Sequence, residues 1–108
     1  MNALNKILVC LEEIQASETN HIDVSKTSSI ADHIVITSGK NQRHNRAIMH
    51  AVITLANQLG EKNIRTEGAD YCQWILIVFG DIIVHIMLPE TRTYYALDKL
   101  WHGEPSSE

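Results

Sequence analysis

The residues of this sequence that could bind a metal or act in catalysis are six histidines, two cysteines and a few isolated acidic residues. Metal sites usually place such side chains at short spacings, as in HxxxH, HExxH or a Cys-His cluster, and the sequence contains none of these. Cys10 and Cys72 form no CxxC motif and have no local signature of a nucleophile beside a base. We therefore expect no metal and no cofactor, and we expect both thiols to be small fillers in a reducing compartment.

Phosphate chemistry is equally poorly supported. Ser38-Gly39-Lys40 is too short for a phosphate-binding loop, and no GxGxxG motif occurs. Asp32 and Asp81 are isolated, whereas two-metal phosphoryl transfer needs close carboxylates; a turn or strand-end role suits each better. Arg43-His44 lies at the start of a predicted helix, where positive charge opposes the helix dipole, so a structural and a binding role both stay open. The sequence predicts no enzyme.

Composition indicates an ordinary globular protein. The chain has 108 residues, of which 44% are hydrophobic and 20% charged, and its net charge is −4. We expect a single domain over 1–103 and a disordered tail over 104–108. The nine Lys and Arg residues are scattered rather than gathered into a basic stripe, so little direct RNA binding is expected, while docking on a basic protein is allowed.

The N-terminal stretch has a lysine and then acids soon after a short apolar run, without a small-residue cleavage site. A signal peptide is therefore not expected, and we predict a cytoplasmic protein.

The other elements must be organised around Trp74 to Met87, WILIVFGDIIVHIM. Gly80-Asp81 divides this run into halves too short to span a membrane and favours a tight turn between two strands. An even turn puts aliphatic residues and one Phe on one face: Ile75, Ile77, Phe79, Ile82, Val84 and Ile86. The opposite face also contains Trp, His and Met: Trp74, Leu76, Val78, Ile83, His85 and Met87. Such residues tolerate a shared or partly wet surface.

Periodicity predicts the remaining elements. Asn41 is expected to cap the second of three helices, Gly60 to end it, and Pro89 to begin the third, whose apolar face is Tyr94, Leu97, Leu100 and Trp101. The predicted helices lie near 2–16, 41–59 and 89–102, and the predicted strands at 21–24, 32–37, 64–67 and both halves of the central run.

The fold class is α/β (α+β), a mixed five-stranded sheet with three helices. The first two helices are enough to cover one face of the sheet. The face that carries Trp74 must then be covered by a partner, by a second copy of the chain or by the third helix.

The sequence resembles the ribosomal silencing factor family (RsfS, or Iojap) from about Leu4 to Trp101. The resemblance rests on the order and spacing of four segments: SSIADHIVITSGKNQRH at 28–44, Glu67-Gly68, the run at 74–87, and PETRTYYALDKLW at 89–101. It implies a nucleotidyltransferase-like topology without catalytic carboxylates. It also implies a translational repressor that binds the large ribosomal subunit through its fourteenth large-subunit protein and blocks joining of the small subunit when nutrients are short.

The family's Trp, Gly-Asp and His-x-Met elements fall on Trp74, Gly80-Asp81, His85 and Met87. Combined with the second face of the hairpin, this predicts a partner-binding surface made of Trp74, Leu76, Val78, Asp81, Ile83, His85, Met87 and Tyr71. Two positions depart from the family pattern. Val78 replaces a common Asp and makes the surface more apolar, and Asn41 replaces a usual Ser while keeping the ability to cap a helix.

Two other function classes compete with this hypothesis. An apolar sheet face can pair with its own copy, which would make the protein a homodimeric regulatory module without ribosome binding. A small nucleotide-acting enzyme would share the fold but lacks the acids. Co-sedimentation with large subunits separates these alternatives.

Overall fold

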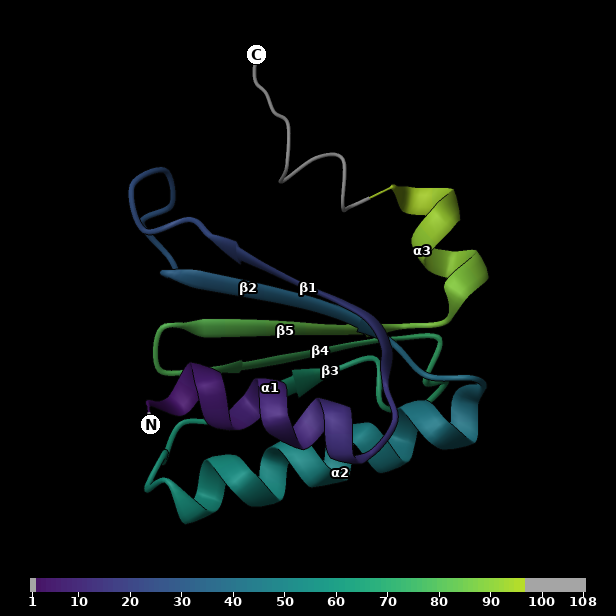
Figure 1. The fold of residues 1–108 in the computed structure, drawn as a ribbon, viewed down its shortest axis with the longest axis horizontal. Helices are drawn as coiled ribbons and strands as arrows, with labels where there is room; N and C mark the ends of the chain where they lie inside the picture. Colours follow the sequence, from purple (N-terminus) through teal and green to yellow (C-terminus); the bar gives the residue numbers. More distant parts are fainter. Residues whose placement is uncertain (1, 97–108) are drawn as a thin grey trace.

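The structure is a computed structural model that describes residues 2–96, which form one mixed five-stranded sheet and three helices (Figure 1). The strand order is β1-β2-β5-β4-β3, in which only β2 and β5 pair in parallel. Parallel neighbours need a long crossover, and here the chain between them forms α2, β3 and β4. The elements are α1 Ala3–Glu13, β1 Ser17–Asp23, β2 His33–Ser38, α2 Gln42–Gln58, β3 Arg65–Glu67, β4 Trp74–Phe79, β5 Ile82–Met87 and α3 Pro89–Tyr95. The predicted fold class is confirmed.

The central hairpin has the predicted register. Phe79 pairs with Ile82 and Ile77 with Val84, so Gly80-Asp81 is a two-residue turn. Gly80 has a φ of +55°, the sign that a type II′ turn requires at its first central position.

Helices α1 and α2 lie side by side over one face of the sheet (Figure 1). All six residues of the predicted aliphatic face are at most 3% exposed, and they pack against Ile7 and Leu11 of α1 and Ile48 and Val52 of α2. Both helices begin at an asparagine cap. Asn2 Oδ1 accepts the Asn5 N–H at 2.8 Å, and Asn41 Oδ1 accepts the His44 N–H at 2.8 Å. The predicted cap at Asn41 is therefore confirmed.

Three predicted boundaries are wrong. α1 ends at Glu13 rather than at 16. β1 begins at Ser17 rather than at 21, because an irregularity between Ser17 and Asn20 lets the strand continue its pairing as far as Ser38. α3 ends at Tyr95, since Ala96 adopts the left-handed conformation with a φ of +54° and its N–H bonds the Arg92 carbonyl at 2.9 Å. The rest of the third predicted helix, with Leu97, Leu100 and Trp101, and the predicted tail at 104–108 lie outside the described residues.

Candidate functional site

The candidate site is the sheet face opposite α1 and α2. Strand register places Leu76 beside His85 and Val78 beside Ile83 on this face, with Trp74 at the end next to α3. All five side chains are partly exposed. We call Trp74, Leu76, Val78, Ile83 and His85 the β4–β5 face. These five residues are the part of the predicted partner-binding surface that β4 and β5 bring together on one face.

Met87 is the exception within that predicted surface. Its side chain is 0% exposed and packs in a second small core with Val24, Ile34 and Ile36. Met87 pairs with Ser38 of β2, and α3 starts only two residues later and turns back over this corner of the sheet (Figure 1). The prediction that Met87 is part of the accessible surface is therefore wrong, and its role is packing beneath Trp74, which contacts the same cluster.

Asp81 and Tyr71 are exposed but are not brought together. Asp81 is in the turn at the far end of the hairpin, where its carbonyl accepts the N–H groups of Asp32 at 2.9 Å and His33 at 3.1 Å. Tyr71 is 76% exposed and precedes the opposite end of β4. A six-residue strand is about 20 Å long, so one small ligand could not contact both residues.

Trp74 is held in place by His85. The indole Nε1–H donates a hydrogen bond to His85 Nδ1 at 3.0 Å, with the ring centroids 5.9 Å apart. Burial lowers the pKa of His85 from 6.5 to about 4. The imidazole is therefore neutral at physiological pH, and because Nδ1 accepts the indole hydrogen bond, its proton is on Nε2. His85 positions the indole ring, and its lowered pKa makes it only a weak base.

An aromatic row continues from Trp74 onto α3. The rings of Trp74 and Tyr95 are 4.8 Å apart, and Tyr95 meets Tyr94 edge to face at 5.0 Å. Tyr94 and Tyr95 are 82% and 54% exposed. The start of α3 is joined to the sheet by Arg92 Nη1, which donates to Ser38 Oγ at 3.1 Å.

A pocket of about 220 Å³ lies beside this row, lined by Gly68, Tyr71, Gln73, Trp74, Thr91 and Tyr95. The sequence prediction missed Tyr95, because it placed only Tyr94 on the apolar side of the helix. The adjacent pair Tyr94-Tyr95, close after the Trp strand, was the available signal.

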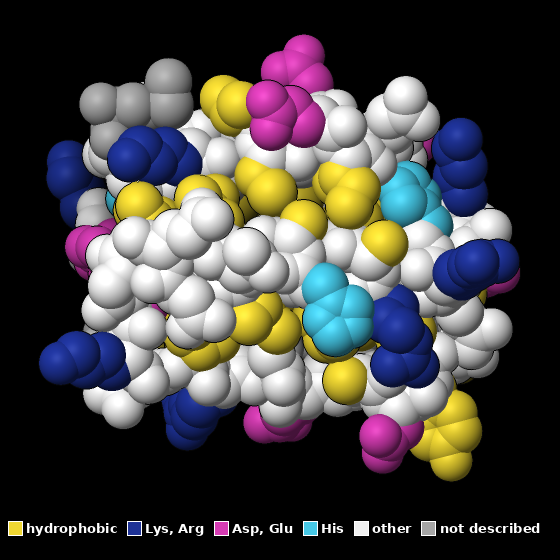
Figure 2. Space-filling view, turned by 90° about the horizontal axis from the view of Figure 1, so that it is seen from below, with side chains coloured by type: hydrophobic (Ala, Val, Ile, Leu, Met, Phe, Trp, Pro, Cys, Tyr) yellow, Lys and Arg dark blue, Asp and Glu magenta, His cyan; other side chains and the backbone are white. Residues whose placement is uncertain are grey.

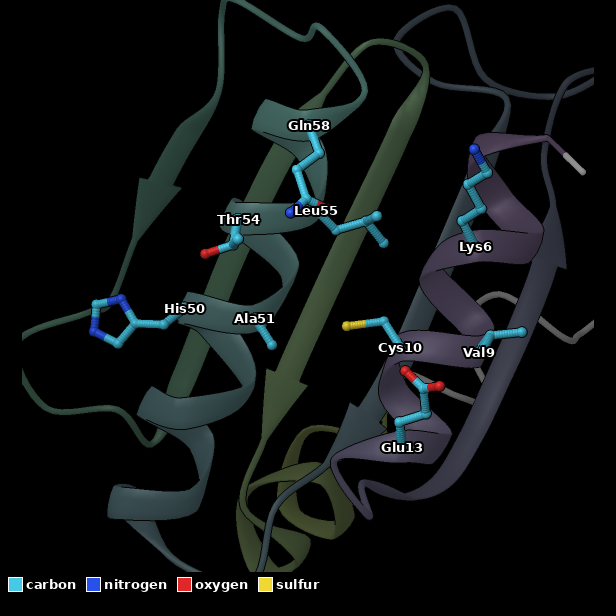
Figure 3. Close-up of a pocket in the computed structure, with 9 residues that line it drawn as sticks. All are labelled: Lys6, Val9, Cys10, Glu13, His50, Ala51, Thr54, Leu55 and Gln58. Atoms are coloured by element: carbon cyan, nitrogen blue, oxygen red, sulfur yellow. The ribbon is translucent and has the colours of Figure 1, made fainter.

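A larger hollow of about 520 Å³ lies on the other side of the molecule, between α1 and α2 (Figure 3). Figure 2 shows this side, with hydrophobic side chains along its middle and most Lys and Arg toward its edges. Cys10 points across the hollow toward Ala51 and Leu55, whereas His50 points away. Burial and the nearby Glu13 carboxylate raise the pKa of Cys10 above its usual 9.0. The thiol therefore stays protonated near neutral pH and is not an activated nucleophile.

The other chemical candidates have structural roles. His44 Nδ1 accepts the Lys40 N–H at 2.9 Å, so its Nε2 carries the proton and donates to the Ile14 carbonyl at 2.8 Å. These bonds give His44 a structural role as a link between α1 and the start of α2. A binding role for Arg43-His44 stays a prediction. Within residues 2–96, no three His, Cys, Asp or Glu side chains converge as a metal site would require. No helix in that part of the chain is long and apolar enough to cross a membrane.

The architecture places the protein among small α+β domains built on one mixed sheet. Comparison with known proteins gives the family, because the whole chain, residues 1–108, matches the one described as ribosomal silencing factor during starvation. The chain belongs to the ribosomal silencing factor family, whose members are ribosome-associated regulators of translation.

Relatives and a solved structure agree with this assignment. The ribosomal silencing factor RsfS of Chromobacterium violaceum is 31% identical, covering 90% of this chain and 80% of its own. The mouse protein named mitochondrial assembly of ribosomal large subunit protein 1 is 32% identical over 91% of this chain, which spans 44% of the mouse protein. A crystal structure of a Chromobacterium violaceum protein superposes with a TM-score of 0.88 at 29% identity, covering 97% of this chain and 88% of the other.

Proposed function

We propose that the protein represses translation by binding the large ribosomal subunit and blocking joining of the small subunit. The contact on the large subunit is the ribosomal protein numbered fourteen in that subunit. The family match supports a ribosomal role, and the name of the mouse relative supports the large subunit. The observation that carries the surface assignment is Trp74, which is half-exposed and fixed by His85 and Tyr95. Rigid Trp side chains at the centre of an interface are frequent hot spots.

The β4–β5 face has the composition of a protein interface. Its centre is apolar and carries no charged side chain. Arg65 and Glu67 of β3 pair with Val78 and Leu76, so they lie on the same side and supply an exposed polar edge. An apolar centre with a charged rim is typical of surfaces that bind proteins, and the net charge of −4 suits a basic ribosomal protein.

The experiment is co-sedimentation with purified large subunits, comparing wild type with Leu76→Ser. Val9→Ser is the matched control, since Val9 is a 40% exposed aliphatic on α1, on the opposite side of the sheet. We expect Leu76→Ser to reduce the bound fraction and Val9→Ser to leave it unchanged. Equal binding by the two variants would place the docking surface elsewhere.

The same apolar face favours a second candidate function, a homodimeric regulatory module in which the face pairs with its own copy. Analytical ultracentrifugation of the free protein tests this candidate. A dimer that Leu76→Ser dissociates would show that self-association and ribosome docking compete for one surface. We further propose that the protein binds RNA directly only to a small extent and catalyses no reaction. Nucleotide turnover that is lost on replacing Asp32 or Asp81 would contradict the second part.

A further inference from the structure

Two histidines face each other across the outermost pair of strands. His21 is in β1 and His33 begins β2, and His21 Nε2 lies 3.0 Å from His33 Nδ1. Their ring centroids are 5.0 Å apart, with the planes inclined at 45°. His21 is exposed and His33 half-exposed, so the pair is open to solvent. Neither residue belongs to the β4–β5 face, since both lie on the side of the sheet that carries Val35 and the main core.

The backbone around the pair is fixed by hydrogen bonds. Asp23 pairs directly with His33 across the two strands, and its Oδ1 accepts the Ser25 N–H at 2.9 Å and the Ser25 hydroxyl at 2.6 Å. The His33 N–H donates to the Asp81 carbonyl at 3.1 Å. Because the strand pairing holds the two backbones in register, the two side chains start from neighbouring positions, which reduces the ordering cost of binding a ligand.

The separation of the two nitrogens fits a shared metal ion. With metal–nitrogen bonds of about 2.0–2.1 Å, two ligands are about 2.9 Å apart at a right angle and about 3.3 Å apart at the tetrahedral angle. The observed 3.0 Å, which is the length of the hydrogen bond between the rings, is close to both values and nearer to the right-angle one. Right angles between neighbouring ligands are typical of tetragonal copper(II) and nickel(II), for which imidazole is a suitable donor.

We propose that His21 and His33 form a two-imidazole chelate for a divalent late first-row transition metal ion, with copper(II) bound most tightly. Binding replaces the hydrogen bond between the rings by two metal–nitrogen bonds. The ring that donated this hydrogen bond moves its proton to its other nitrogen, so two neutral imidazoles bind the ion without net proton release. A small rotation of both rings directs the two lone pairs at one point.

The electrostatic surroundings favour a cation at this place. Asp23 interacts electrostatically with both imidazoles, so a negative charge lies close to the proposed ion. Since no three ligand side chains converge in the described part of the chain, water would fill the remaining coordination positions.

The test is calorimetric titration of the untagged full chain with copper(II), nickel(II) and zinc(II) near neutral pH. Wild type is compared with His21→Gln, His33→Gln and the control His50→Gln, which removes an exposed histidine on α2. We expect one copper(II) ion per chain, bound more tightly than nickel(II) or zinc(II). Either Gln variant of the pair should weaken binding by roughly a hundredfold, because the second imidazole no longer binds intramolecularly. The control should bind as wild type does.

Wild-type affinity in His33→Gln, or an equal loss in His50→Gln, would show adventitious surface binding and overturn the proposal. Nuclear magnetic resonance of the wild type with copper(II) tests the site without any variant, so the result does not depend on how the variants fold. Copper(II) is paramagnetic and should broaden the amide signals of residues 20–24 and 32–34 before any others. Broadening that begins elsewhere would contradict the site.

Discussion

The indole Nε1–H of Trp74 donates a hydrogen bond to His85 Nδ1 at 3.0 Å. This bond joins the partly exposed aromatic residue of β4 to a neutral histidine on β5. Leu76 is the residue directly opposite His85, so the Trp74–His85 contact runs diagonally across the hairpin. Diagonal neighbours are within reach of aromatic side chains. The contact gives the β4–β5 face one rigid aromatic anchor at its end next to α3, and the proposed docking depends on this anchor.

The first prediction concerns pH. Folded His85 has a pKa lowered to about 4, whereas the unfolded chain has the ordinary value near 6.5. Between these values the unfolded state binds more protons, so His85 makes the protein less stable as the pH falls from 6.5 to 4. The loss at pH 4 should be about 2–3 kcal/mol.

His85→Gln keeps an acceptor for the indole but removes the titration. Urea unfolding from pH 7 to pH 4 should therefore show a smaller loss of stability for His85→Gln than for wild type. Parallel stability curves for the two proteins would mean that His85 titrates normally in the folded state.

The second prediction concerns Gly68, which precedes β4. A Cβ at Gly68 would collide with the backbone carbonyl oxygen of Trp74, whereas a Cβ at Gly60 would meet no atom within 4 Å. The two glycines have nearly equal φ values of +84° and +87°, so Gly60→Ala is a matched control for backbone strain alone. We expect Gly60→Ala to cost about 1 kcal/mol and Gly68→Ala distinctly more, with weaker subunit binding because Trp74 is displaced. If Gly68→Ala and Gly60→Ala lose equal stability in urea unfolding, the backbone of β4 must shift away from the new side chain at little energetic cost.

The third prediction separates structure from binding at His44. Since both ring nitrogens of His44 are hydrogen-bonded to the backbone, His44→Ala should destabilise the protein by about 1–3 kcal/mol. Binding to large subunits should be unchanged under conditions where the variant is folded. A folded His44→Ala that fails to co-sediment would revive the binding role for this position.

Much of the fold follows from local patterns. The alternation in 74–87 with one turn residue pair determined the hairpin register, and Asn41 marked the start of α2, because both signals act over a few neighbouring residues. The burial of Met87 could not be predicted in this way. It depends on a cluster that joins Met87 to Val24, Ile34 and Ile36, residues more than 50 positions away in the chain. The end of α3 before Ala96 could not be predicted from the sequence either, because alanine seldom adopts the left-handed conformation that it has here.

The candidate site was predicted in part for the same reason. Five members of the predicted surface lie together on the β4–β5 face because strand alternation alone places them there. The contribution of Tyr95 and the Trp74–His85 hydrogen bond depend on side-chain packing between elements, which periodicity does not report.

In the proposed function, Trp74 anchors docking on the large subunit and so prevents subunit joining. The direct measurement is light scattering of separated subunits allowed to join in the presence of increasing concentrations of wild type, Trp74→Ala or the control His50→Ala. Because an indole anchor is worth about 2 kcal/mol or more, Trp74→Ala should need roughly thirtyfold more protein for the same inhibition, while His50→Ala should match wild type. Urea unfolding of the same samples verifies that each variant is folded. A folded Trp74→Ala that inhibits joining at wild-type concentrations would show that Trp74 does not anchor the docking.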